Sequence, residues 1–384
     1  MQLAWQSLED GAEPEYISGD IPWNVEEGAI SADRKRAVFT TNEDGMTKVY
    51  LMDTTTRAYA PVSGLPIGYA GGMLFSPSGD RLAMTLNTPS TPSDTFVLAL
   101  GKGATEHGAL ERWTYSEVGG LDTDSFIEPE LIRYTSFDGL SVPAWVYKPA
   151  GPGPHPVLID IHGGPESQER PYFSSSVQMW LAKLGVAVIA PNVRGSAGYG
   201  KSYVAMDNGF KREDSVRDIG ALLDWVATQP DLDAGKVAVF GGSYGGYMVL
   251  ACAVHYSDRL KAAVDIVGIS NFVTFLENTQ DYRRDLRRVE YGDERDPKMR
   301  AHLQKISPLT NVDKITIPML VLQGENDPRV PVTEAVQIVN ALRANGQAVW
   351  YMNALNEGHG YRKKENRDVG QQAVVLFLQE HLLK

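Results

Sequence analysis

Two patterns of apolar and polar positions divide the chain. Up to about residue 120, short apolar runs alternate with polar turns, as in "RKRAVFTTNEDGMTKVYLMD" and "GDRLAMTLNTPSTPSDTFVLAL". Each of these stretches predicts two antiparallel strands joined by a turn. Further along, nearly continuous apolar runs alternate with stretches of helical periodicity. The sequence therefore predicts an all-β region over residues 1–120 and a larger region of mixed strands and helices over residues 121–384.

The first region contains a repeat. Arg36 and Arg81 occupy matching places in "SADRKRAVF" and "SPSGDRLAM", 45 residues apart. This period is typical of propeller blades, which are four-stranded sheets, and the shared pattern favours blades over two unrelated hairpins. About two blades cannot close a ring, so we expect a partial β-propeller with strand edges that need covering. The second region or a second copy of the chain would cover them, and a homo-oligomer is therefore one expectation.

Five apolar runs in the second region have the composition of strands buried on both faces of a parallel sheet: "PVLIDIH", "GVAVIAP", "KVAVF", "AAVDIVG" and "PMLVLQG". Between two of them, Val216, Ile219 and Val226 recur at helical spacing. Such alternation indicates an α/β doubly wound sheet. The preceding stretch "ELIRYTSFDGLSVPAWVYKPAG" predicts a hairpin with its turn at Asp138-Gly139, which would add antiparallel edge strands.

One serine lies between two glycine pairs in "VAVFGGSYGGYMVL", after a predicted strand and before a predicted helix. The stretch matches the pattern G-x-S-x-G, which in this context predicts the nucleophile elbow of an α/β-hydrolase, with the hydroxyl of Ser243 held above the sheet. A serine hydroxyl is a weak nucleophile and needs a base, and the base needs an orienting group. In this fold the three follow one another along the chain as Ser, acid and His.

That chain order selects the partners of Ser243. Among the later histidines, His302 precedes the strand "PMLVLQG" and His381 lies in the terminal helical pattern. His359 lies in the glycine-flanked loop "NEGHGY", and loops of this kind commonly carry catalytic residues. Asp327 directly follows "MLVLQGEN", in a loop after a predicted strand, whereas the other acidic candidates lie in polar stretches or inside a strand. We therefore predict a catalytic triad of Ser243, Asp327 and His359.

Backbone N–H groups are expected to bind the oxyanion that forms during acyl transfer. Gly164, in the turn "DIHGGP" after a predicted strand, is the first expected donor, and Gly163 is the alternative. Tyr244, which follows the nucleophile, is the second. For His162 we expect a structural hydrogen-bonding role.

Two further features have open interpretations. Glu166 and Arg170, in "GGPESQERP", are candidate contacts for charged substrate ends, and a mutual salt bridge at helical spacing is the alternative. The segment 276–300 has a dense mixture of charges and predicts a solvated helical insertion.

A rival motif is "GSAGYGKS" at residues 195–202, which matches the phosphate-binding pattern G-x-x-x-x-G-K-S. A phosphate-binding loop runs directly into a well-formed helix. Here the following "YVAMDNGFKRED" has no sustained helical period and contains the turn signal Asn208-Gly209. We therefore interpret this stretch as a structural loop tied down by hydrogen bonds from Arg194, and nucleotide hydrolysis is not expected.

The amino-acid composition excludes some classes of binding partner and indicates a cellular location. The 384 residues carry a formal charge of −12, which disfavours nucleic acids and anionic membranes as partners. No stretch has the length and apolarity of a membrane span, and the first fifteen residues lack the pattern of a secretory signal. Cys252 is the only cysteine, so we expect a cytoplasmic protein, with an acidic secreted one as the alternative. Because no metal-binding motif is found, neither a metal nor an organic cofactor is expected.

Taken together, several motifs resemble the prolyl oligopeptidase family of serine peptidases, and most closely its acylaminoacyl-peptidase branch: "HGGP", "NVRGSAGYGKSY", "GGSYGGYM", "GENDPRVP" and "NEGHGYRK". The resemblance covers about residues 125–384. It implies a C-terminal α/β-hydrolase domain with Ser243, Asp327 and His359 as the triad, and Gly164 and Tyr244 in the oxyanion hole. It also implies an N-terminal propeller, which in the family usually has seven or eight blades and restricts access to the active site.

The sequence therefore predicts a serine hydrolase that cleaves acyl-peptide or short peptide bonds through an acyl-enzyme intermediate. The alternative is a carboxylesterase that acts on small acyl esters, because an incomplete propeller would leave the site open. A third reading is a binding module built on an inactive hydrolase scaffold. The expected partner is a small peptide for the peptidase, a small ester for the carboxylesterase and an unspecified ligand for the binding module.

Overall fold

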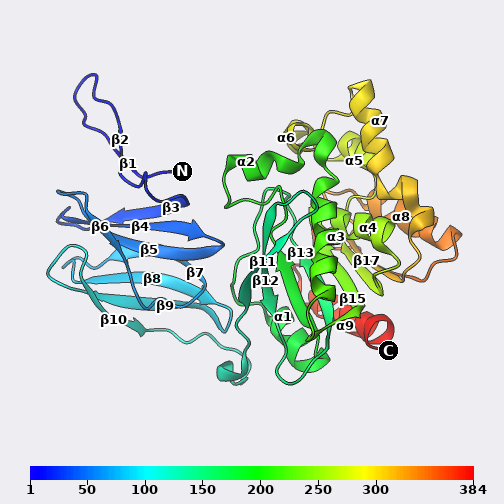
Figure 1. Cartoon of the computed structure of the whole chain (residues 1–384), viewed down its shortest axis with the longest axis horizontal. Helices are drawn as coiled ribbons and strands as arrows, with labels where there is room; N and C mark the ends of the chain where they lie inside the picture. The colour runs from blue at the N-terminus through cyan, green and yellow to red at the C-terminus, as the bar shows by residue number, and fades with distance from the viewer. The chain divides into compact units, whose positions relative to one another are not determined.

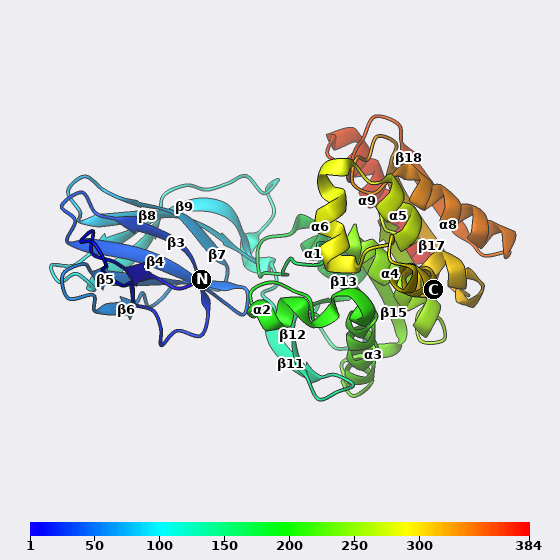
Figure 2. The same cartoon turned by 90° about the horizontal axis from the view of Figure 1, so that it is seen from above.

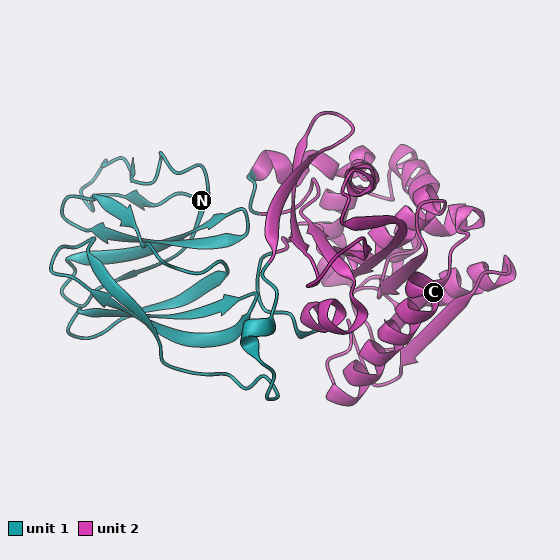
Figure 3. Ribbon diagram, turned by 60° about the horizontal axis from the view of Figure 1, so that its bottom comes forward, with its two compact units in different colours: residues 1–128, 170–175, 198–200 teal, residues 129–169, 176–197, 201–384 magenta.

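The computed structural model describes residues 1–384 and divides into two compact units (Figure 3). Unit 1 comprises residues 1–128, 170–175 and 198–200, and unit 2 comprises residues 129–169, 176–197 and 201–384. The boundary expected at residue 120 therefore lies somewhat later, and two short segments from the predicted second region, residues 121–384, belong to unit 1. Arg170 shows why, because its guanidinium forms an ion pair with Glu26, 144 residues earlier in the chain. Local sequence patterns carry no information about such remote pairs.

Unit 1 consists of two four-stranded antiparallel sheets and a two-stranded sheet (Figure 1). The first sheet contains β3 (Asn24–Ile30), β4 (Arg36–Glu43), β5 (Met46–Asp53) and β6 (Tyr59–Pro61). The second contains β7 (Tyr69–Phe75), β8 (Arg81–Thr88), β9 (Thr91–Leu100) and β10 (His107–Arg112). The small sheet pairs β1 (Ala4–Trp5) with β2 (Glu15–Tyr16). Because the strands of each four-stranded sheet follow one another in chain order, the predicted all-β partial propeller is confirmed.

The predicted repeat extends to single hydrogen bonds. Arg36 and Arg81 each begin the second strand of their sheet, after the same kind of turn. In the first turn, the N–H of Ser31 donates to the carbonyl of Arg36 over 2.9 Å, and in the second the N–H of Ser76 donates to the carbonyl of Arg81 over 3.0 Å. In both, the serine hydroxyl accepts the arginine N–H over 3.1 Å. Two local sequences of the same pattern thus form the same turn.

The two faces of the first sheet pack against different parts of the chain. Alternate residues of β4 and β5 point to opposite faces, as strand geometry requires. Val49 and Leu51 pack with residues of the second sheet in one apolar cluster. Phe39 and Tyr50 lie in another cluster, together with Trp23 and other residues of the N-terminal segment. This segment therefore covers the sheet face that does not contact the second sheet.

Unit 2 is built on one eight-stranded sheet with the order β11-β12-β14-β13-β15-β16-β17-β18. Its strands are β11 (Glu130–Thr135), β12 (Ser141–Tyr147), β13 (His155–Ile161), β14 (Ala187–Pro191), β15 (Leu232–Gly242), β16 (Ala262–Ile266), β17 (Met319–Gly324) and β18 (Val349–Ala354). β11 and β12 form the predicted antiparallel hairpin, and the strands from β14 onward pair in parallel. β14 and β17 are buried along their whole length, because both faces of the sheet are covered. The predicted α/β-hydrolase fold is confirmed.

The helices of unit 2 connect and cover these strands. They are α1 (Ser175–Met179), α2 (Lys201–Val204), α3 (Asp214–Ala227), α4 (Tyr244–Tyr256), α5 (Phe272–Asn278), α6 (Asp281–Tyr291), α7 (Pro297–Ile306), α8 (Val332–Ala344) and α9 (Lys364–Leu378). The charged segment 276–300 forms α6 and parts of α5 and α7, which are inserted between β16 and β17. Figure 2 shows α5 and α6. None of the helices combines the length and apolarity needed to cross a bilayer.

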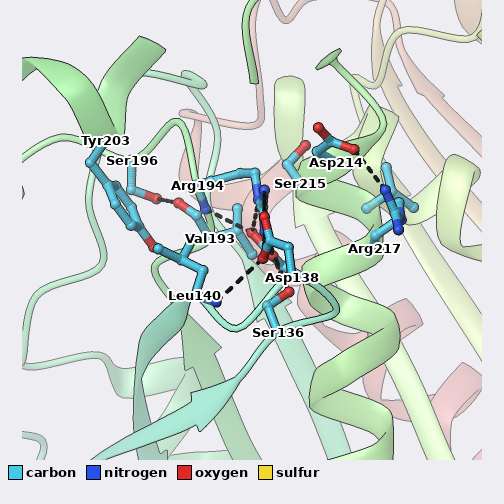
Figure 4. Close-up of polar contacts among 12 residues, drawn as sticks. Ser136, Asp138, Leu140, Val193, Arg194, Ser196, Tyr203, Asp214, Ser215 and Arg217 are labelled. Atoms are coloured by element: carbon cyan, nitrogen blue, oxygen red, sulfur yellow. Dashed lines mark hydrogen bonds and ion pairs between the residues drawn. The ribbon is translucent and has the colours of Figure 1, made fainter. Parts of the chain in front are cut away.

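The loop that matches the phosphate-binding pattern has no helix suited to a phosphate. The helix that follows it, α2, is only four residues long. The loop is anchored by Arg194, whose guanidinium bonds the carboxylate of Asp218 over 2.8 Å and that of Asp138 over 2.9 Å (Figure 4). The hydrogen bonds from Arg194 lower the pKa of Asp138 to about 2. These contacts agree with the interpretation of a structural loop.

Candidate active site

Ser243 has a backbone conformation that non-glycine residues rarely adopt. It lies between β15 and α4 with φ 61° and ψ −117°, and such strain persists only where the surroundings enforce it. The glycines next to Ser243 show how the surroundings enforce this conformation. A Cβ atom at Gly241 would lie 2.6 Å from the carbonyl oxygen of Gly245, and one at Gly245 would lie 2.0 Å from the carbonyl oxygen of Ile161. The flanking glycines are therefore required because the turn packs directly against itself and β13.

The three predicted triad residues follow three strands of one parallel sheet. Ser243 follows β15, Asp327 follows β17 and His359 follows β18. Because parallel strands end at the same edge of a sheet, all three lie at the edge where ligands bind in such folds. The loops after β17 and β18 also contact each other, since the N–H of Asn326 donates to the carbonyl of Glu357 over 2.9 Å.

Asp327 and His359 are hydrogen-bonded to each other. Nδ1 of His359 lies 2.7 Å from Oδ2 of Asp327, whose side chain has no solvent exposure. The other carboxylate oxygen, Oδ1, accepts the backbone N–H groups of Arg329 over 2.8 Å and Val330 over 3.0 Å. A carboxylate can only accept hydrogen bonds, so Nδ1 of His359 carries a proton. In the neutral ring, Nε2 is then left with a lone pair that can act as a base.

The loop after β13 packs against the elbow. A Cβ atom at Gly163 would lie 2.9 Å from the carbonyl oxygen of Gly242 and 3.3 Å from Cβ of Ser243, so only glycine fits there. Gly164 has φ 133°, and a Cβ atom at this position would lie 2.9 Å from the backbone nitrogen of Glu166. Both glycines of the motif are therefore set by close backbone contacts.

His162 orients the peptide plane between these two glycines. Its Nδ1 lies 2.7 Å from the carbonyl oxygen of Gly163, and its Nε2 lies 2.8 Å from Oγ of Ser196. In a trans peptide the carbonyl and the N–H point in opposite directions. By holding the carbonyl of Gly163, His162 fixes the direction of the N–H of Gly164. Burial lowers the pKa of His162, which suits a neutral ring with this structural role.

The side chain of Tyr244 is anchored in a buried polar cluster behind the elbow. Its hydroxyl lies 2.9 Å from Oγ of Ser215, 3.1 Å from Oδ2 of Asp207 and 3.2 Å from Nη1 of Arg212. Tyr244 is the first residue of α4, and the first N–H groups of a helix have no partner within the helix. The cluster therefore fixes a residue whose backbone N–H is available to an anion. Asp207 and Arg212 have no solvent exposure, and sequence analysis did not single them out.

Glu166 and Arg170 do not form the salt bridge considered from their spacing, and that expectation is wrong. No helix forms over these residues, so they do not share a helical face. The guanidinium of Arg170 instead bonds Glu26 over 3.1 Å, the carbonyl of Gly45 over 2.8 Å and the hydroxyl of Thr47 over 2.9 Å, all within unit 1. These bonds argue against a contact between Arg170 and substrate. Glu166 is exposed, and its role as a substrate contact stays a prediction.

Asp265, in β16 next to the elbow, has a buried carboxyl group that forms no ion pair and no hydrogen bond with another side chain. The carboxyl fills the space that two glycines leave open. A Cβ atom at Gly246 would lie 2.4 Å from Oδ1 of Asp265, and one at Gly268 would lie 2.1 Å from it. Burial raises the pKa of Asp265 to about 8 from an ordinary value of 3.8, so the protonated form is favoured in the folded protein at neutral pH.

We expect Asp265→Asn to reduce the pH dependence of stability between pH 5 and 7. A carboxyl whose pKa rises on folding contributes its full stability below its unfolded pKa and loses it as the pH rises toward its folded pKa. The free energy of unfolding of the native protein should therefore fall relative to that of the variant by about 1.4 kcal/mol per pH unit in this window. Urea denaturation of both proteins at pH 5, 6 and 7 measures the difference. Parallel pH profiles would show that Asp265 ionises normally.

Comparison with known proteins adds family information. A model of the prolyl oligopeptidase family matches residues 171–384, which is more than half of the chain. A dipeptidyl aminopeptidase BIII from Pseudoxanthomonas mexicana is 37% identical over 216 residues, covering 56% of this chain and 31% of that protein. The human acylamino-acid-releasing enzyme is 26% identical over 381 residues, covering 92% of this chain and 50% of that protein. The chain thus spans half or less of the length of these two relatives.

A solved structure has the same arrangement of elements. The acylaminoacyl peptidase of Pyrococcus horikoshii matches with a TM-score of 0.81 at 23% identity, covering 97% of this chain and 58% of that chain. At this level of identity, the match supports the fold, including the N-terminal β unit and the α/β-hydrolase unit.

Proposed function

We propose, from the premise that this chain belongs to the prolyl oligopeptidase family, that it cleaves acyl-peptide or short peptide bonds by acyl transfer to Ser243. The observation that carries the proposal is the 2.7 Å contact between His359 and a fully buried Asp327, at the sheet edge where the strained Ser243 also lies. A base oriented by a carboxylate and a serine on a nucleophile elbow are the two parts that acyl transfer requires.

The first half of the reaction forms an acyl-enzyme. Nε2 of His359 accepts the proton of the Ser243 hydroxyl while Oγ attacks the acyl carbon. Asp327 holds Nδ1–H and stabilises the imidazolium that forms. The backbone N–H groups of Gly164 and Tyr244 bind the developing oxyanion. The imidazolium then gives its proton to the leaving amine, and the bond between the acyl carbon and the nitrogen breaks.

The second half releases the acyl group. Water takes the place of the amine, and Nε2 of His359 accepts a proton from it as its oxygen attacks the acyl carbon. Collapse of the second tetrahedral intermediate breaks the bond to Oγ of Ser243, which recovers its proton from His359. Each step uses groups of this chain and water, and the same two N–H groups bind the oxyanion in both halves.

The names of the relatives favour peptide substrates over the carboxylesterase alternative. Both curated relatives described above are named as enzymes that act on peptides or acylated amino acids. Amides are less reactive acyl donors than esters, so peptide hydrolysis depends more on protonation of the leaving group and on substrate position. A peptidase is therefore expected to have a higher kcat/KM for an amide substrate than an esterase has.

The test compares kcat/KM for an N-acetyl-aminoacyl anilide and a short-chain p-nitrophenyl ester, each with wild-type protein and Ser243→Ala. We expect Ser243-dependent turnover of both, with an amide rate within about a hundredfold of the ester rate, because leaving-group protonation by His359 compensates for the poorer leaving group. Ester turnover with no detectable amide turnover would refute peptide hydrolysis and establish an esterase. No turnover of either substrate, together with no labelling of Ser243 by a fluorophosphonate, would support the inactive-scaffold reading.

A further inference from the structure

Arg287 on α6 reaches the loop that carries Gly164. Its Nη1 donates a hydrogen bond to the carbonyl oxygen of Gly164 over 2.9 Å and also contacts the carboxylate of Glu290. The side chains of Arg287 and Glu290 are 13% and 6% exposed. We propose that Arg287 is a positioning residue, which holds the N–H of Gly164 in the direction needed to bind the oxyanion. The proposal rests on the proposed function, in which that N–H is one of the two donors.

Gly164 has more backbone freedom than any other residue type would have at this position. Glycine lacks a Cβ atom, so even before Pro165 its backbone has more freedom than that of other residues, and the φ of 133° lies in a region that they avoid. The direction of the Gly164 N–H depends on the peptide plane before it and, through these dihedrals, on the plane after it. Without further contacts, this loop would sample several N–H directions. An oxyanion hole needs a donor that is in place before the reaction begins.

Two side chains hold those two planes. His162 bonds the carbonyl of Gly163 in the plane before Gly164, over 2.7 Å. Arg287 bonds the carbonyl of Gly164 in the plane after it, over 2.9 Å. Fixing both planes fixes φ and ψ of Gly164. A guanidinium suits this role because its charge strengthens the bond, and its planar shape lets Nη1 bond the carbonyl and Glu290 together.

The same helix end is also connected to the second proposed donor. The backbone carbonyl of Glu290 accepts a hydrogen bond from Nη2 of Arg212 over 2.6 Å. Nη1 of Arg212 lies 3.2 Å from the hydroxyl of Tyr244, which provides the other N–H group. Arg212 is fully buried, so this connection is not exchanged with water. A single network, from Gly164 through Arg287, Glu290 and Arg212 to Tyr244, therefore links the two sides of the oxyanion hole.

The chain offers a matched control on the same helix. Arg288 is also 13% exposed, and it pairs with Glu294, which is 3% exposed. Its hydrogen bonds go to Glu294 and Asp285, and none goes to the glycine loop. Arg288→Met thus removes an equally buried arginine and leaves an equally buried glutamate unpaired. It differs from Arg287→Met in leaving the contact with Gly164 in place, and it also removes the ion pairs of Arg288 with Asp285 and Asp293.

The experiment measures kcat and KM of Arg287→Met, Arg287→Lys and Arg288→Met for the anilide substrate. It also measures affinity for two ligands: an N-acetyl-aminoacyl trifluoromethyl ketone, which forms an oxyanion adduct with serine, and the matching N-acetyl-amino alcohol, which does not. We expect Arg287→Met to lose kcat about 10- to 100-fold with KM within about threefold, somewhat less than the loss of a whole oxyanion donor. Affinity for the ketone should fall in parallel, whereas affinity for the alcohol should stay within about threefold of wild type.

Arg288→Met should keep kcat within about threefold of wild type, and Arg287→Lys should lie between the two methionine variants, because an ammonium keeps the charge but not the planar pair of donors. Equal losses for the ketone and the alcohol, or a loss of kcat no larger than in Arg288→Met, would overturn the proposal. If Arg287→Met does not fold, as judged by circular dichroism, the same criteria apply to Arg287→Lys. Ser243→Ala separates the two hypotheses: an active Ser243→Ala refutes the proposed function, whereas an inactive one beside an unaffected Arg287→Met refutes only the role of Arg287.

Discussion

Replacing Ser243 with alanine is expected to lower kcat for both the anilide and the ester by about 10⁵- to 10⁶-fold, because the substitution removes the atom that forms the acyl-enzyme. Binding of substrate should persist, since the oxyanion donors and the backbone around the elbow stay in place. Alanine also lacks a hydroxyl that a fluorophosphonate could modify. Intact-mass spectrometry after treatment with the reagent should therefore show one adduct on the wild-type protein and none on the variant.

The control for this prediction is Ser202→Ala. Ser202 is exposed on α2 and is the last residue of the stretch that matches the phosphate-binding pattern. Its removal should leave both turnover and labelling unchanged. Turnover by Ser243→Ala within tenfold of wild type, or a fluorophosphonate adduct on another residue, would contradict the assignment of Ser243 as the nucleophile.

The candidate site could be proposed from the sequence because its signals are local. Ser243, Asp327 and His359 each follow an apolar strand, and both the strand patterns and the order along the chain are visible in the sequence. A parallel sheet then brings the ends of these strands to one edge without any remote contact having to be known. The glycines of the elbow were visible for the same reason, since their role depends on the backbone of their own turn and of one neighbouring strand.

The residues that support the site were not predictable in this way. Arg287 and Arg212 lie in charge-rich stretches, and the first of these was interpreted as a solvated insertion. Charge density alone cannot show which arginines of a helix turn inward. Arg287 is nearly buried, and it bonds two residues. Gly164 is far from it in the sequence, whereas Glu290 is on the next turn of the same helix. Burial of a charge depends on partners that only the folded structure brings together.

The wrong expectation of a salt bridge between Glu166 and Arg170 has a related cause. A spacing of four residues indicates a salt bridge only if the segment is helical, and here it is not. Arg170 instead bonds Glu26 and Gly45, which belong to the strands and turns of unit 1. The repeat in unit 1 was predictable because each blade-like sheet is contiguous in sequence. The contribution of residues 170–175 to that unit was not, because no local pattern records it.

Asp327→Asn is expected to lower kcat by about 10⁴-fold while the fold is retained, and the contacts of Asp327 explain why. Oδ1 accepts the N–H groups of Arg329 and Val330, so the amide oxygen of an asparagine must take this position. The amide NH₂ then replaces Oδ2 opposite His359, where it can only donate. His359 must accept at Nδ1 and carry its proton on Nε2. The ring is then in the tautomer that cannot take the proton of Ser243.

Two measurements test the predicted change of tautomer in His359 and the loss of kcat. Nitrogen NMR of His359 should show a proton on Nδ1 in the wild-type protein and on Nε2 in the Asp327→Asn variant, both with a neutral ring. Steady-state kinetics should show the loss in kcat with little change in KM, because Asp327 is proposed to act through His359 and not on the substrate. Asp313→Asn, at an exposed aspartate outside the site, is the matched control and should behave as wild type. A kcat of Asp327→Asn within tenfold of wild type would mean that Asp327 does not orient the base, and the acid of the triad would then have to be sought elsewhere.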